Sequence, residues 1–146
     1  MADKTQRSVA LQRTGLGQYE VSNTRGGTIT IGTGDGSDFT PVELLLAALG
    51  GCTGADVDYI TSKRAEPDSF SVHVTGDKIR DETAGNRLIN LAIELGITFP
   101  EGAAGDAARQ ALPRAVQMSH DRLCTVSRTV ELGTPVNTHT APPPTD

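Results

Sequence analysis

The chain has few aromatic residues and very little sulfur. Its 146 residues include three Phe, two Tyr and no Trp, and the sulfur is confined to two Cys and two Met. Nucleic-acid bases stack on aromatic side chains, and a net charge of −5 disfavours contact with phosphate. Both shortages argue against nucleic acid as a partner. The hydrophobic core must be built from Leu, Ile, Val and Ala.

The sequence also lacks the long apolar segments that membranes and secretion require. No stretch approaches the roughly 20 apolar residues needed to span a bilayer. The polar residues 1–7 are not followed by the apolar region of a signal peptide. We therefore expect a cytoplasmic protein with no membrane contact. In a reducing compartment, a transient catalytic disulfide suits two cysteines better than a lasting structural one.

One domain is expected over residues 8–137, because a chain of 146 residues can bury one workable core. Residues 1–7 are predicted to be a flexible N-terminus. Residues 138–146 have no periodicity and contain three consecutive prolines, which predicts a disordered tail.

The pattern between the two ends predicts an α+β fold with the element order βββ-α-ββ-α-β. The predicted elements are strands over 8–13, 18–22 and 28–31, a helix over 41–63, strands over 69–78 and 87–98, a helical stretch over 105–123 and a last strand over 127–132. Glycines between the first three strands suit tight turns. Pro113 interrupts the second helical stretch, so we expect a kink or two separate segments there.

The helix over 41–63 is the most clearly predicted element. Thr40 suits the N-cap, Pro41 the first helical position, and Glu43 completes a capping box. Apolar residues recur at helical spacing and place Cys52 on the same stripe. The helix is apolar on most sides, which predicts burial on several of them. Its length of about 35 Å indicates either a central spine or a helix that reaches into a partner subunit.

Two features indicate that the cysteines are more than apolar filler, which is the alternative interpretation of any buried Cys. Gly50 and Gly51 precede Cys52 inside the helix, where each costs about 1 kcal/mol relative to Ala. Such a pair predicts close approach to the backbone there, by another helix or by a substrate. Cys124 lies at an element boundary, and two thiols can meet if their Cα atoms come within about 7 Å.

Two thiols and a nearby arginine suffice for a peroxidase cycle. A thiolate that attacks a peroxide O–O bond becomes a sulfenic acid, and a second thiol condenses with it to a disulfide. An ordinary Cys has a pKa of about 8.5, which a nearby cation lowers. The candidate cations are Arg13, Arg25 and Arg122.

The run from Thr40 to Thr53, TPVELLLAALGGCT, resembles the OsmC/Ohr family of thiol peroxidases, as do the downstream Ser119-His120 and Cys124. The predicted order of elements is also similar to that family's over about residues 8–137. The resemblance implies an intertwined homodimer in which the long helices pack in the middle and the active sites lie at the subunit interface.

The resemblance also implies roles for the two cysteines. Cys52 matches the peroxidatic cysteine and Cys124 the resolving one. The family reduces organic hydroperoxides in preference to hydrogen peroxide and uses no metal or flavin, so we expect no cofactor. A dithiol donor, which is a lipoyl group in some members, reduces the disulfide again.

The chain departs from the family pattern at the catalytic carboxylate. Well-characterised members carry a Glu ten residues before the first Cys, whereas here that position is Val42 and Glu43 lies nine residues before. One residue on a helix is a rotation of about 100°, so capping alone can explain Glu43. For the cation, Arg25 is the first choice, although no matching motif identifies it and an ordinary surface Arg is the alternative.

Three other constellations are weaker. His120 and Cys124 could form the base and nucleophile of a hydrolase, which leaves Cys52 without a use. Both cysteines and His120 could bind zinc, but no close-spaced pair such as C-x-x-C is present. The loop over 35–38 lacks the ligand spacing of a calcium loop.

The leading hypothesis is therefore a thiol-dependent peroxidase that reduces organic hydroperoxides. Cys52 attacks, Cys124 resolves, and Arg25 and Glu43 help to ionise Cys52. The alternative is a non-catalytic dimer of the same fold that binds a small apolar or thiol-reactive ligand in the interface cleft. A purely structural dimer is a third interpretation.

Overall fold

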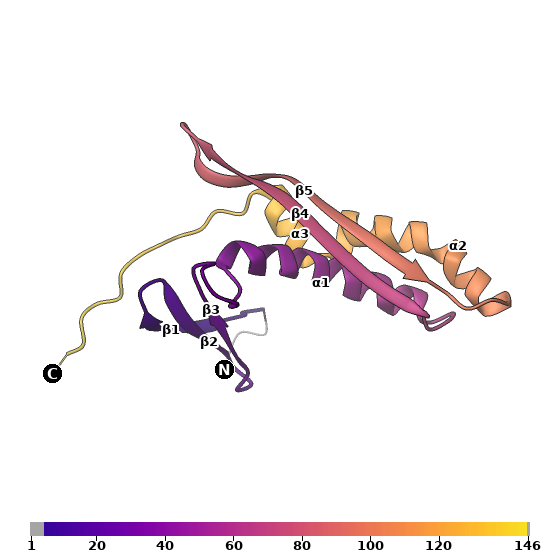
Figure 1. Ribbon diagram of the computed structural model, residues 1–146, viewed down its shortest axis with the longest axis horizontal. Coiled ribbons are helices and arrows are strands. Elements are labelled where there is room, and N and C mark those ends of the chain that lie inside the picture. Colours follow the sequence, from indigo (N-terminus) through magenta and orange to yellow (C-terminus); the bar gives the residue numbers. More distant parts are fainter. Residues whose placement is uncertain (1–4, 146) are drawn as a thin grey trace. The chain divides into compact units, whose positions relative to one another are not determined.

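A computed structural model describes residues 5–145 of the protein. Its mixture of helices and strands confirms the α+β class, and the element order follows the prediction up to the last element (Figure 1). The elements are β1 (Val9–Gly15), β2 (Gln18–Asn23), β3 (Thr28–Ile31), α1 (Pro41–Thr61), β4 (Ser69–Asp81), β5 (Gly85–Thr98), α2 (Ala103–Met118), the π-helical segment η1 (Ser119–Leu123) and α3 (Thr125–Leu132).

The chain forms two compact units, one ending at Ala48 and one beginning at Leu49. The single domain expected over 8–137 stays a prediction. Residues 1–4 of the predicted flexible N-terminus and residue 146 of the predicted tail lie outside the described residues. Residues 134–145 contain no helix or strand, and their disorder also stays a prediction.

The first unit is built on an antiparallel sheet in the order β1-β2-β3. Its turns use glycine as predicted, since Gly17 and Gly26 have φ angles of 70° and 90°, where a side chain would be strained. In the turn between β2 and β3, the side-chain oxygen of Asn23 accepts hydrogen bonds from the N–H groups of Arg25 and Gly27, both at 2.9 Å. Arg25 lies in this turn, and its side chain is exposed.

The predicted capping box opens α1. The Glu43 N–H donates to Thr40 Oγ1 at 3.2 Å, and the Thr40 N–H donates to Glu43 Oε1 at 3.1 Å. Together these two bonds satisfy donors that a helix N-terminus leaves free. The helix has 21 residues, which corresponds to about 32 Å, and it ends at Thr61, close to the predicted end.

The second unit contains a long antiparallel hairpin, β4 and β5, that runs along α1 (Figure 1). The side chains of Phe70, Val72 and Val74 alternate with exposed ones, as the sequence predicts. Across from them, Val72 pairs with Leu95 and Val74 with Ile93. This apolar face of the hairpin is the surface against which the helices pack.

Gly50 explains how closely α1 approaches β4. A Cβ at Gly50 would lie 2.6 Å from Val74 Cγ2 and 3.2 Å from Val72 Cγ1, whereas at Gly51 it would meet nothing within 4 Å. The close approach at Gly50 is made by strand side chains and not by the expected helix or substrate. At Gly51 the approach of a helix or a substrate stays a prediction.

Helix α1 is buried on fewer sides than its apolar composition predicts. One stripe is buried, namely Leu49, Gly50, Thr53, Gly54, Val57 and Thr61, while Tyr59 is 77% exposed. The expectation of burial on several sides is thus wrong for a single chain. Within residues 5–145, no helix combines the length and the apolarity that crossing a bilayer needs.

The predicted last strand over 127–132 is wrong, because these residues belong to helix α3. The β-branched residues of this segment favour a strand, but local capping overrides that preference. The Cys124 sulfur accepts the Ser127 N–H at the start of the helix, and Gly133, with φ 66°, ends it. Arg128 and Glu131 add an ion pair of 2.8 Å one turn apart.

Helix α2 continues through Pro113 as one segment, so the two-segment expectation is wrong. The change in winding comes instead at Ser119, where the chain becomes π-helical as far as Leu123. Short π-helical segments often occur at functional sites. Here the segment leads directly into Cys124.

Candidate functional site

The two cysteines come together although they lie on different elements. Cys52 is in the fourth turn of α1, and Cys124 stands between η1 and α3. Both are free thiols, with Cys124 fully buried and Cys52 partly exposed. Their sulfurs and a carboxylate oxygen of Asp56 all lie within 4.8 Å of one another. The predicted proximity of the two thiols is thus present.

The surroundings of Cys124 favour its thiolate. The sulfur accepts hydrogen bonds from the Ser127 N–H at 3.4 Å and from Thr53 Oγ1 at 3.6 Å, and the Ser127 hydroxyl lies 3.3 Å away. Burial raises the pKa of Cys124, but the bonds with Ser127, Cys52 and Thr53 outweigh it. The net pKa is therefore lower than that of an ordinary Cys, because donors aimed at sulfur stabilise its charged form.

The surroundings of Cys52 have the opposite effect. Burial raises the pKa of the Cys52 thiol, the Val126 N–H lowers it, and the neighbouring Cys124 and Asp56 raise it again. The net pKa is higher than ordinary. Both sulfurs nevertheless interact with backbone N–H groups in the first turn of α3, Val126 for Cys52 and Ser127 for Cys124.

Asp56 is a site residue that the sequence analysis missed. It lies one helical turn after Cys52 on α1, and its Oδ2 accepts a hydrogen bond of 2.8 Å from the buried Ser119 hydroxyl. The spacing of four residues puts Cys52 and Asp56 on one helix face, so the signal was present in the sequence. Thr53 and Ser119 stand in the two blocks that resemble the family, whereas no sequence signal distinguishes Ser127 from other small polar residues.

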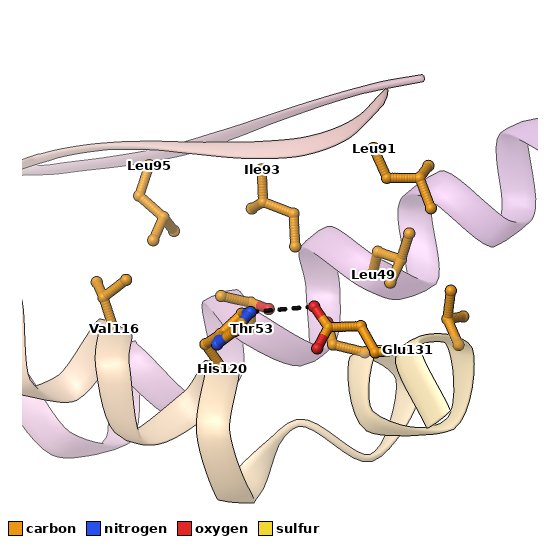
Figure 2. A pocket seen from close by; sticks show the side chains of 10 residues that line it. Leu49, Thr53, Leu91, Ile93, Leu95, Val116, His120 and Glu131 are labelled. Atoms are coloured by element: carbon orange, nitrogen blue, oxygen red, sulfur yellow. Dashed lines mark hydrogen bonds and ion pairs between the residues drawn. The ribbon is translucent and has the colours of Figure 1, made fainter. Parts of the chain in front are cut away.

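A cavity of about 250 Å³ lies between strand β5 and the helices (Figure 2). Its apolar walls are formed by Leu49, Leu91, Ile93, Leu95, Val116 and Val130. Figure 2 shows side chains from β5 on one side of the cavity, facing Val116 and His120 from the helices. Thr53 and Ser127, which bond to the Cys124 sulfur, belong to its polar lining. A mainly apolar space therefore lies one side chain away from the Cys124 sulfur.

His120 lines the same cavity but is not paired with a cysteine. Its Nε2 lies 3.0 Å from Glu131 Oε1 and its Nδ1 lies 2.9 Å from Asp121 Oδ1. The bond with Asp121 and the charge of Glu131 raise the pKa of His120. Because both ring nitrogens contact carboxylates, the structure does not present His120 to Cys124 as a base.

Arg25 and Glu43 belong to the first unit, whereas the cysteines belong to the second. Glu43 is engaged with Thr40, whose backbone and side chain lower the pKa of the Glu43 carboxyl. The capping role of Glu43 is therefore present. The roles of Arg25 and Glu43 toward Cys52 stay predictions.

Comparison with known proteins identifies relatives along most of the chain. A family model described as OsmC-like protein matches residues 34–139. An uncharacterised protein of Mycobacterium tuberculosis is 33% identical over 129 residues, which cover 87% of this chain and 90% of the relative.

Solved structures share the fold. A hypothetical protein from Aquifex aeolicus superposes with a TM-score of 0.69 and 26% identity, over 88% of this chain and 89% of the other. The organic hydroperoxide resistance protein OhrB of Bacillus subtilis superposes with a TM-score of 0.54 and 15% identity, over 85% and 90% of the two chains. At 15% identity, the similarity to the Bacillus subtilis protein shows a shared fold only.

Proposed function

The chain belongs to the OsmC-like protein family, and we propose that it is a thiol-dependent peroxidase that reduces organic hydroperoxides. One observation carries the proposal. Two free thiols from different elements lie within 4.8 Å of each other, and two residues that contact the Cys124 sulfur, Thr53 and Ser127, line a mainly apolar cavity. Such a pair is what a cycle through a sulfenic acid and a disulfide requires.

In the proposed cycle, the Cys52 thiolate attacks the terminal oxygen of the hydroperoxide. An S–O bond forms, the O–O bond breaks, and the departing alkoxide takes a proton to become an alcohol. The Cys124 thiolate then attacks the sulfenic sulfur of Cys52, an S–S bond forms, and hydroxide leaves as water. An external dithiol reduces the disulfide by thiol–disulfide exchange and is itself oxidised.

The two thiolates of this cycle are stabilised in different ways. The bonds around Cys124 supply the thiolate of the resolving step. Cys52 needs a cation, since burial, Cys124 and Asp56 raise its pKa. We propose that Arg25 is that cation and that Glu43 also helps to ionise Cys52. We further propose that a dithiol donor of the lipoyl type reduces the disulfide and that the protein works in the reducing cytoplasm.

The cavity supports an organic rather than an inorganic peroxide. Its walls are mainly leucine, isoleucine and valine, and its polar lining consists of Thr53, Ser127, His120 and Glu131. An alkyl or aryl group loses contact with water in such a space, which favours its binding. Hydrogen peroxide has no apolar part and gains nothing from these walls.

We also propose that the working form is an intertwined homodimer. Large apolar side chains are exposed in the single chain, among them Tyr59 at 77% and Leu132 at 72%. Exposed apolar area of this kind marks contact surfaces. A partner that covers α1 would also account for a helix that is apolar on most sides yet buried on one stripe.

The test is hydroperoxide consumption by the reduced chain with a dithiol donor. We expect the wild type to consume cumene hydroperoxide faster than hydrogen peroxide, and Cys52→Ser to be inactive. In Cys124→Ser, the Cys52 sulfenic acid should accumulate and react with a dimedone probe. Equal rates for the wild type and Cys52→Ser contradict the catalytic proposal.

A specific observation favours the alternative function, a non-catalytic dimer that binds a small apolar or thiol-reactive ligand in the interface cleft. Burial, Cys124 and Asp56 raise the pKa of the Cys52 thiol above the ordinary value, and a thiol that stays protonated is a poor nucleophile. Alkylation rates measured against pH separate the two functions. A peroxidase requires one thiol that ionises below the ordinary range in the assembled protein, whereas a binding protein shows two slow thiols.

A further inference from the structure

The proposed cycle makes no use of Asp56, although this carboxylate is part of the cysteine cluster. Its oxygen lies within 4.8 Å of both sulfurs, and the Ser119 hydroxyl holds it at 2.8 Å. We propose that Cys52, Asp56 and Cys124 together bind one thiophilic divalent cation, Zn²⁺ first, when the thiols are reduced. The bound ion is a reversible inhibitor that occupies both sulfurs, and it is distinct from a resident cofactor.

The geometry of the three groups fits a zinc site that keeps one position open. In a tetrahedral site with Zn–S bonds of about 2.3 Å and Zn–O bonds of about 2.1 Å, neighbouring ligand atoms lie about 3.6–3.8 Å apart. The ligand atoms here are already within 4.8 Å of one another. Small side-chain rotations suffice, and water completes the four ligands.

The cluster has a sequence pattern that favours metal binding once Cys124 is placed beside it. Cys52 and Asp56 are four residues apart on α1, a spacing that puts two ligands on one helix face. The third ligand, Cys124, comes from a separate element. Two ligands on a rigid helix and one from outside it form a preorganised site.

The charge balance supports a cation rather than a neutral ligand. Two thiolates and one carboxylate bring three negative charges into a partly buried space, and their mutual repulsion opposes ionisation. A divalent cation offsets two of these charges. The N–H groups of Val126 and Ser127 act on the sulfurs, while Ser119 orients Asp56 from the outer side, as partners of metal ligands commonly do.

Binding and oxidation exclude each other. When Zn²⁺ binds, two Zn–S bonds and one Zn–O bond form, and each thiol releases its proton. The Cys52–Cys124 disulfide has no thiolate to offer, so the oxidised chain should not bind the ion. Metal binding is therefore a property of the reduced state alone.

The experiment uses the full chain, reduced and kept anaerobic, titrated with Zn²⁺ against a chromophoric chelator and separately with Co²⁺. We expect one equivalent of tight metal and a near-ultraviolet sulfur-to-cobalt charge-transfer band. Cys52→Ser and Cys124→Ser should each lose most of that band. Outer-shell partners of a metal contribute about 10–100-fold in affinity, so Asp56→Asn, which removes a direct ligand, should weaken Zn²⁺ binding at least about tenfold.

The matched control is Asp58→Asn, which changes an exposed carboxylate on the same helix and should leave binding unchanged. Asn at position 56 can still accept the Ser119 bond, and circular dichroism verifies the fold of each variant. The diamide-oxidised wild type tests the thiolates without any substitution. Equal affinity in Asp56→Asn and wild type, or equal affinity in the oxidised and reduced chains, overturns the proposal.

The outcome is separable from that of the peroxidase assay. A reduced chain that binds Zn²⁺ through these three residues but does not consume cumene hydroperoxide keeps this inference and rejects the proposed activity. A chain that consumes hydroperoxide at the same rate with and without saturating Zn²⁺ rejects the inhibitory role.

Discussion

At the scale of single residues, the sequence points to both cysteines, and the structure shows that their surroundings differ. Cys124 is fully buried among hydrogen-bond donors, and Cys52 is partly exposed beside Asp56. The cysteines could be predicted because thiols are rare in this chain. Ser127 could not, because small polar residues are common and only the fold brings this one to sulfur.

Ser127 should control the ionisation of Cys124. Ser127→Ala removes the hydroxyl at 3.3 Å and keeps the N–H bond, so the pKa of Cys124 should rise. A hydrogen bond contributes about 0.5–1.5 kcal/mol, so disulfide formation at neutral pH should slow roughly three- to tenfold. Stopped-flow measurement of disulfide formation after one equivalent of hydroperoxide provides the rate.

Thr125→Ala is the matched control, because this exposed side chain lies in the same turn. It should leave the rate unchanged. If Ser127→Ala also reacts at the wild-type rate at every pH, the hydroxyl does not act on Cys124.

His120 makes a pH-dependent contribution to stability. Its pKa is raised above the ordinary 6.5 by Asp121 and Glu131, and Arg128 competes for Glu131 at 2.8 Å. A raised pKa in the folded state means that the stabilisation is fully present below pH 6.5 and is lost as the pH rises through the folded value. The melting-temperature gap between wild type and His120→Gln should therefore be larger at pH 6 than at about pH 9.

Nuclear magnetic resonance titration of the His120 ring gives its pKa directly. A His120 midpoint at or below the ordinary value shows that the two carboxylates do not hold the imidazolium.

At the scale of elements, most of the fold could be predicted because its signals are local. Alternation identifies β4 and β5, and a capping box marks the start of α1. Helix α3 could not be predicted, because its β-branched residues favour a strand and its N-cap is the sulfur of Cys124. The element that was predicted wrongly is also the one whose first turn interacts with both sulfurs.

Two glycines of α1 that face β4 should respond in opposite directions to alanine. In Gly50→Ala the new Cβ would lie 2.6 Å from Val74 Cγ2, which forces strand or helix to shift. Overpacking of this kind costs about 1–3 kcal/mol, against a gain in helix propensity of about 1 kcal/mol. We expect a net loss of up to about 2 kcal/mol in the free energy of unfolding.

Gly54→Ala is the matched substitution one turn later. Its Cβ would make ordinary contacts, at 3.4 Å with Val72 and 3.8 Å with Phe70. Helix propensity then dominates, and stability should rise by about 0.5–1 kcal/mol. Urea denaturation of both variants measures the two values, and equal effects would show that α1 does not approach β4 more closely at Gly50.

At the scale of the whole molecule, one face of α1 connects the structure to the proposed dimer. Gly51, Ala55 and Tyr59 recur at helical spacing, and all three are exposed in the single chain. Small residues on one face let two helices approach closely, and the large exposed Tyr59 adds apolar area. The sequence shows that the helix is apolar on most sides, but only the fold shows which side is left for a partner.

Ala55→Arg should therefore convert a dimer to monomers. The dimer mass is expected at 2 × 15.3 = 30.6 kDa, and light scattering over a dilution series gives the dissociation constant. A charge forced into a close helix contact without a partner costs about 2 kcal/mol or more, which corresponds to about a thirtyfold rise in that constant. Ala55→Ser keeps the small volume and should stay dimeric.

Because the proposed active site lies at the subunit interface, hydroperoxide turnover should fall together with the dimer fraction. A wild type that is monomeric, or an Ala55→Arg variant that stays dimeric, would show that α1 does not form a dimer interface.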